Sequence, residues 1–127
     1  MSEDTIGVLY NEGYGGFRLS DEAQRLYHER GGSDVPFFKR SDPLMVSIVR
    51  ELGPVRASGH ADSKIAIETI PARYVNHYRI SEYDGDECVL IQYEAYKVDA
   101  VLAILHDGQL TDAERIARIR AAVLETP

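Results

Sequence analysis

Residues 64–94 read KIAIETIPARYVNHYRISEYDGDECVLIQYE, and this stretch decides the fold class. Residues 64–70 alternate apolar with polar or small side chains, and residues 78–83 and 87–94 continue the pattern, so three successive strands are predicted. Asp84-Gly85, between the last two, is typical of a two-residue hairpin turn. Three strands without an intervening helix argue against a doubly wound parallel sheet.

One more strand and four helices are predicted outside this stretch. Residues 5–11 alternate and form the additional strand. Ser20, Asp42 and Thr111 are favourable helix caps, and they predict helices over 21–30, over 43–52 and from 112 onward. A further helix is expected over 96–105. We therefore expect one α+β domain over residues 1–127, with an antiparallel or mixed four-stranded sheet covered by about four helices.

Composition narrows the classes of function. The 127 residues carry a formal net charge of −7, which disfavours nucleic acid as a partner because phosphate binding needs a basic surface. The acidic start and the lack of a long apolar run predict neither a signal peptide nor a membrane span, so we expect a cytoplasmic protein. Cys88, the one cysteine, is predicted to be buried in a strand.

The first candidate site is the glycine-rich loop of residues 12–17, between a strand and a helix. Glycines let a ligand approach the backbone, a helix N-terminus attracts anions, and Arg18 adds a positive charge. The loop has neither the dinucleotide fingerprint nor the Lys-Ser/Thr pair of a phosphate-binding loop. The alternative is a tight strand-to-helix turn with Phe17 directed into the core.

The second candidate site is the stretch of residues 56–79, which concentrates cations and tyrosines in an acidic chain. Positive charge suits a phosphate and aromatic rings suit a base, so the stretch predicts an anionic, nucleotide-like ligand. The alternative is that these residues occupy solvated strand and loop positions. The predicted ligand-binding residues are Arg18, His60, Arg73, Tyr74, His77, Tyr78 and Arg79.

Catalytic and metal-binding patterns are weak. The four histidines have no spacing typical of a metal site, and no serine or cysteine lies in a nucleophile motif. The acids at the predicted hairpin tip, Glu82, Asp84, Asp86 and Glu87, are interpreted as a solvated surface. We accordingly expect no catalytic residue, no metal and no cofactor.

Several blocks resemble a family of small uncharacterised proteins of bacteriophages and large DNA viruses. They are Tyr14-Gly15-Gly16-Phe17, Leu19-Ser20-Asp21-Glu22-Ala23, Asp42-Pro43-Leu44, Glu51-Leu52-Gly53, Ile70-Pro71 and the run Ile80-Ser81-Glu82-Tyr83-Asp84-Gly85-Asp86-Glu87. The likeness covers residues 10–89, while residues 56–63 fit with a small insertion and the last two helices depart from it. The resemblance implies a small accessory protein of viral or prophage origin, acting in the host cytoplasm, and transfers no activity.

Three functions remain open from the sequence. The first is a binding protein that sequesters an anionic, nucleotide-like signalling molecule, a role typical of small viral proteins. The second is a protein–protein interaction module, such as a homodimer that blocks a host enzyme, because the final helix is amphipathic and an acidic surface can dock on a basic partner. The third is a small nucleotide hydrolase with His60 or His77 as its base.

Overall fold

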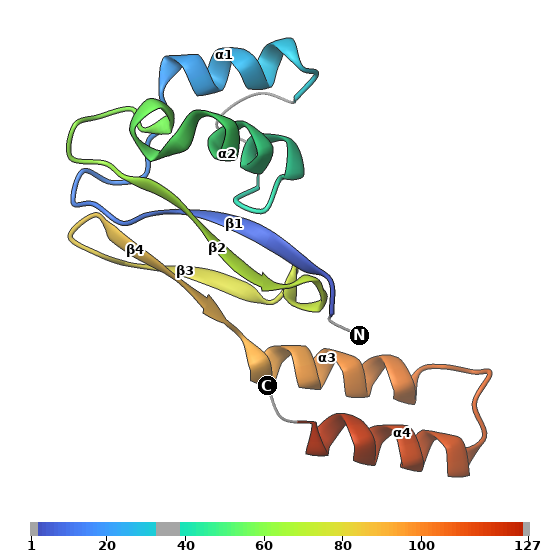
Figure 1. Ribbon diagram of the computed structural model, residues 1–127. Helices are drawn as coiled ribbons and strands as arrows, with labels where there is room; N and C mark the ends of the chain where they lie inside the picture. Colours follow the sequence, from blue (N-terminus) through green and yellow to red (C-terminus); the bar gives the residue numbers. More distant parts are fainter. Residues whose placement is uncertain (1–2, 33–38, 126–127) are drawn as a thin grey trace. The chain divides into compact units, whose positions relative to one another are not determined.

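The computed structural model describes residues 3–32 and 39–125, and the chain divides into two compact units, residues 1–90 and residues 91–127 (Figure 1). Helices and strands occur together, which confirms the predicted α+β class. In order, the elements are β1 (Thr5–Asn11), α1 (Asp21–Glu29), α2 (Pro43–Ala57), β2 (Ile65–Pro71), a 3-10 helix (Ala72–Tyr74), β3 (Tyr78–Tyr83), β4 (Asp86–Ile91), α3 (Tyr93–Leu105) and α4 (Asp112–Leu124).

The first unit is built on a two-stranded ribbon. β1 pairs antiparallel with β2, with Thr5 opposite Pro71 and Asn11 opposite Ile65. Helices α1 and α2 lie on one side of this ribbon, and the β3–β4 hairpin lies on the other (Figure 1). Both faces of β1 are covered, since the neighbouring residues Val8 and Leu9 are fully buried. The main apolar cluster comprises Leu9, Leu19, Ala23, Tyr27, Met45, Val46, Ile48, Val49, Ala57 and Ile65.

The predicted helix caps are confirmed. The Ser20 hydroxyl accepts a hydrogen bond from the Ala23 amide at 3.1 Å, and the Asp42 carboxylate accepts one from the Leu44 amide at 2.9 Å. Thr111 and Glu114 form the reciprocal capping box at the start of α4. These contacts satisfy backbone donors that a helix leaves unpaired in its first turn, so the local sequence is sufficient to fix where these helices begin.

The predicted four-stranded sheet is wrong, because the strands form two separate two-stranded sheets, β1–β2 and β3–β4. The β3–β4 hairpin is joined to β1 by side chains: the Asn11 amide group donates to the Gly85 carbonyl, and the Glu87 carboxylate accepts from the Asn11 backbone. Alternation along a strand predicts which residues share a face, but it does not determine which edge another strand pairs with.

The predicted end of α2, the predicted junction between β4 and α3, and the predicted burial of Cys88 also need correction. Helix α2 extends to Ala57, past the predicted stop, because Gly53 takes a non-helical conformation (φ 82°) and the chain then makes a further turn. β4 ends at Ile91 and α3 begins at Tyr93, three residues earlier than expected. Cys88 is exposed, because Glu87 faces inward and successive strand residues point to opposite faces.

The β3–β4 turn has the predicted Asp-Gly geometry and is packed tightly against the glycine-rich loop. Asp84 and Gly85 both have positive φ, 52° and 86°, as a type I′ hairpin turn requires. A Cβ at Gly85 would lie 2.3 Å from the Tyr14 carbonyl oxygen. Glycine is therefore needed here both for its backbone conformation and for the close approach of two loops.

We expect Gly85→Ala to destabilise the protein by roughly 1–3 kcal/mol, because alanine is strained at this φ and its Cβ meets backbone atoms that cannot rotate away. Urea unfolding followed by far-ultraviolet circular dichroism measures the change. Gly108→Ala is the matched control, since a Cβ there has no neighbouring atom within 4 Å. Equal midpoints for the two variants would contradict the tight packing of the turn.

Candidate functional site

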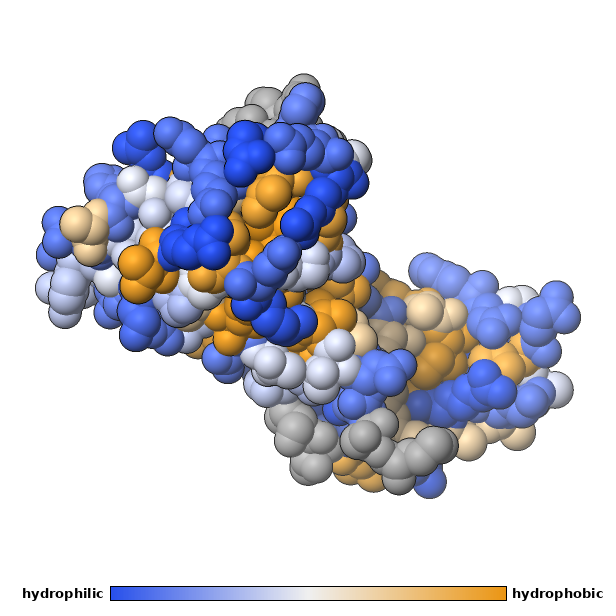
Figure 2. Space-filling view, turned by 45° about the horizontal axis from the view of Figure 1, so that its top comes forward, coloured by the Kyte–Doolittle hydropathy of each residue, from blue (hydrophilic) through white to orange (hydrophobic). Residues whose placement is uncertain are grey.

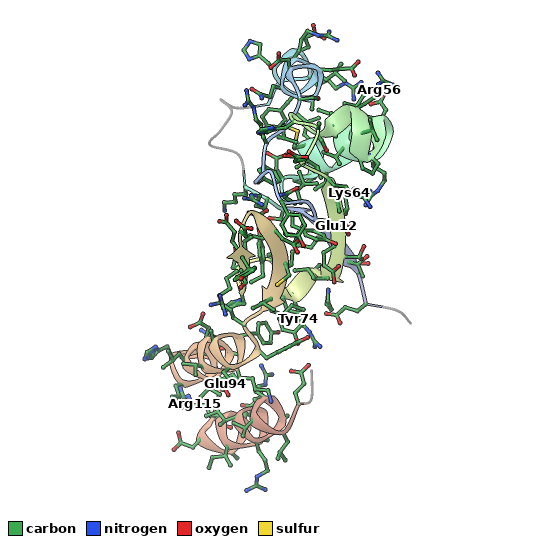
Figure 3. All side chains as sticks on the ribbon, turned by 90° about the vertical axis from the view of Figure 1, so that its left-hand side faces the viewer. Glu12, Arg56, Lys64, Tyr74, Glu94 and Arg115 are labelled. Carbon is green, nitrogen blue, oxygen red and sulfur yellow. The ribbon has the colours of Figure 1, made fainter. Side chains whose placement is uncertain are left out.

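The residues predicted to bind an anionic ligand lie at two opposite ends of the β1–β2 ribbon. Arg18 and His60 belong to the loops at the end where Asn11 faces Ile65, and Arg73 follows the end where Thr5 faces Pro71. A ribbon of this length separates its ends by roughly 20 Å. Figure 3 shows the separation, with Lys64 and Glu12 at one end and Tyr74 at the other. The structure therefore does not bring Arg18 and Arg73 together.

The predicted residues at the Pro71 end are largely engaged within the first unit. Arg73 forms an ion pair with Glu3 at 3.1 Å, and its guanidinium lies 5.0 Å from the centre of the Tyr74 ring. Tyr74 is only 3% exposed, so its ring is not available to stack on a base. His77 and Tyr78 are half-buried, and Arg79 is exposed on β3.

The glycine-rich loop at the other end packs against residues 59–63. The Gly15 amide donates to the Asp62 carbonyl, and a Cβ at Gly13 would lie 2.1 Å from that same oxygen. These glycines let two loops approach each other, and Phe17 is partly buried against the main apolar cluster. His60 lines a shallow depression of about 350 Å³ nearby, but the adjoining Ser58 and Ser63 hydroxyls are already hydrogen-bonded to backbone groups.

Sequence reasoning missed the polar contacts at the centre of the first unit. Glu87 is 8% exposed, so its interpretation as a solvated tip residue is wrong. Its carboxylate accepts two hydrogen bonds from the Arg40 guanidinium, at 2.8 and 3.2 Å, and one from the Asn11 backbone amide at 2.9 Å. Arg40 also stacks over the Phe17 ring, 3.5 Å from its centre. The Glu87 carboxylate is therefore buried and paired with Arg40, which indicates a structural role.

We expect Glu87→Ala to lower the free energy of unfolding by about 3 kcal/mol, because it leaves the Arg40 charge and the Asn11 amide without their acceptor. Chemical unfolding of the variant tests this. Glu82→Ala removes an exposed carboxylate from the same hairpin and should change stability by less than about 0.5 kcal/mol. A Glu87→Ala variant as stable as Glu82→Ala would show that the buried pair is not a structural requirement.

The second unit is an antiparallel helical hairpin with an unusual amount of exposed apolar surface. Neither α3 nor α4 contains a buried residue. Figure 2 shows hydrophobic residues at the surface of this hairpin. The large exposed apolar residues on the two helices are Tyr93, Val98, Leu102, Leu105, Ile116, Val123 and Leu124, with exposures from 37% to 71%.

Three of these exposed apolar residues, Val98, Leu102 and Val123, line an open groove between the two helices. The groove has a volume of about 440 Å³ and is lined mainly by Val98, Val101, Leu102 and Val123. A second depression of about 510 Å³ lies on α4 beside Ile119 and Leu124. We name the first of these, the groove lined by Val98, Val101, Leu102 and Val123, the hairpin groove. Its chemistry suits the apolar face of another helix and offers few groups to a charged ligand.

Other kinds of site have little support among the described residues. In the ranges 3–32 and 39–125, no group of three His, Cys, Asp or Glu side chains is placed to hold a metal ion. None of the helices described there combines the length and the apolar character that crossing a membrane requires. Comparison with models of known families, with curated proteins and with solved structures finds no match to this chain.

Proposed function

We propose that this protein is a protein–protein interaction module whose α3–α4 hairpin associates with a second copy of the chain. One observation carries the proposal: each helix is 13 residues long and neither contains a buried residue. Two packed helices of this size cannot enclose an apolar core, since segments below about 40 residues need an additional source of stability. An apolar helix face needs another element to cover it.

The spacing of the exposed residues favours a helical partner. Val98, Leu102 and Leu105 follow one another at intervals of four and three, which is the spacing of the apolar seam in packed helices. On α4 the same kind of spacing occurs, at intervals of three and four residues, between Ile116, Ile119 and Val123. Two such hairpins would complete a four-helix bundle, in which each hairpin supplies two of the four helices.

Charge and symmetry favour a second copy as this partner. Residues 91–127 carry four basic and six acidic side chains, so the hairpin has a net charge of only −2 and like-charge repulsion between two copies is small. A two-fold contact between identical surfaces closes after two chains. Residues 1–90 carry ten basic and fifteen acidic side chains, and this acidic first unit would remain available for a basic host factor, the partner suggested by the sequence.

Sedimentation equilibrium of the full chain tests the association. We expect the wild-type protein to have twice its chain mass of 14.2 kDa at micromolar concentration. Leu102→Glu places a charge in the hairpin groove and should weaken association by about 100-fold or more, because burying an unpaired carboxylate is costly. Circular dichroism should show that the first unit stays folded, with any loss of helix signal confined to what α3 and α4 contribute.

Ala103→Glu is the matched control, because it adds the same charge to an exposed neighbouring position that does not line the groove. This variant should remain dimeric. A wild-type protein that stays monomeric at about 100 µM would overturn the proposal and would imply that the groove is covered in another way. A Leu102→Glu variant that dimerises like the wild type would overturn it equally.

A further inference from the structure

We infer that a cavity in the first unit, between β1, the end of β2 and the start of α2, binds a small organic molecule through one oxyanionic head, a phosphate ester or a carboxylate. The cavity is partly open to solvent, because Thr5, Arg50 and Thr69 are exposed residues, and it has a volume of about 330 Å³. Its polar lining is provided by Thr5, Ser41, Arg50 and Thr69. This site includes none of the residues that the sequence predicted for an anionic ligand, and it is independent of the hairpin groove.

The key residue is Arg50, whose guanidinium reaches the cavity from α2. Within residues 3–32 and 39–125, Arg50 forms no hydrogen bond or ion pair with another residue, although the chain contains 21 acidic side chains. Among the residues that the structure describes, no aspartate or glutamate lines the cavity. An arginine at a cavity that has no carboxylate partner in ranges 3–32 and 39–125 is chemically suited to bind an anion from solution.

Gly7 explains how the arginine comes to lie there. A Cβ at Gly7 would be 2.8 Å from both the Val46 and Ile67 side chains and 3.6 Å from an Arg50 Nη atom. The missing side chain therefore lets α2 approach the strand and places the guanidinium over the backbone of β1. Glycine weakens the interior of a strand, so its presence in β1 fits a position where a close approach is required.

The remaining groups define the size and charge of the ligand. A guanidinium donates two parallel hydrogen bonds to a carboxylate or phosphate, and the hydroxyls of Thr5, Ser41 and Thr69 can donate more. Apolar side chains such as Ile6 and Val46 line the rest of the cavity. Arg50 is the one cation among the described residues of the lining, which matches a single anionic head. The volume lies at the lower end of the range for small-molecule sites, about 300–1,000 Å³.

The N-terminus of α2 is not the anion-binding group. The Asp42 carboxylate already accepts hydrogen bonds from the Leu44 and Met45 amides at this terminus, and it also accepts one from the Tyr27 hydroxyl. Its charge is thus compensated within the protein. Binding must then depend on Arg50 and the hydroxyl groups, which makes the inference testable by single substitutions.

Nuclear magnetic resonance of the full-length, ¹⁵N-labelled protein provides the test. Propyl phosphate, butyrate and inorganic phosphate are titrated separately to about 10 mM at constant ionic strength, a range in which millimolar dissociation constants are measured. We expect propyl phosphate or butyrate to shift the Gly7, Thr69 and Arg50 amide signals in a saturable way. Tighter binding of propyl phosphate than of butyrate would indicate a phosphate head, and the reverse would indicate a carboxylate head. Weaker binding of inorganic phosphate than of propyl phosphate would show that the organic part contributes.

Arg50→Gln should weaken this binding at least about tenfold, because it removes the charge and the paired donors. Thr69→Val keeps the side-chain shape and should weaken it several-fold. Arg79→Gln, which removes an exposed cation from β3, should have no effect. Leu102→Glu should also leave binding unchanged, so failure of hairpin association and failure of this inference can be told apart. No saturable shift with either organic probe, or equal affinity in Arg50→Gln and wild type, would overturn the inference.

Discussion

The first unit depends on the hydrogen bonds of one fully buried side chain, Asn11. Its amide oxygen accepts from the Gly13 and Lys64 backbone amides, at 3.1 and 2.8 Å, and its amide nitrogen donates to the Gly13 and Gly85 carbonyls, at 2.8 and 2.6 Å. Four backbone groups from three separate segments are thereby fixed at one point. An unpaired polar group in such a place is costly, so the glycine-rich loop, the start of β2 and the hairpin turn hold one another in position.

The two proposed roles belong to different parts of the chain. In the first unit, the Arg40–Glu87 pair and the Asn11 contacts use polar groups to fix the β3–β4 hairpin, and the anion cavity lies near the other end of the ribbon. In the second unit, α3 and α4 contain no buried residue, so apolar surface rather than a polar network determines its behaviour. An acidic first unit that binds a small anion and a hairpin that pairs two chains are compatible functions, because they use different residues.

The sequence predicted the local features of this protein well and its long-range contacts poorly. Ser20, Asp42, Thr111 and Asp84-Gly85 determine helix starts and a turn through neighbours within a few residues, and all of them are confirmed. The sequence pattern predicts a solvated position for Glu87, because nothing near it in sequence reveals that Arg40, 47 residues away, is its partner. Gly7, an isolated glycine within a strand pattern, is a local signal of the proposed anion site. The likeness to phage and viral proteins remains a prediction.

Hydrogen exchange of the full chain, measured by mass spectrometry at two protein concentrations, tests the central claim most directly: the first unit is held by its own contacts and the hairpin by a second copy. The account predicts that peptides covering Asn11, Gly13 and Lys64 keep the same protection at about 1 µM and about 100 µM, since their partners lie in the same chain. Peptides from α3 and α4 should lose protection on dilution as the dimer dissociates. Hairpin protection that does not change with concentration, at a constant monomeric mass, would contradict it.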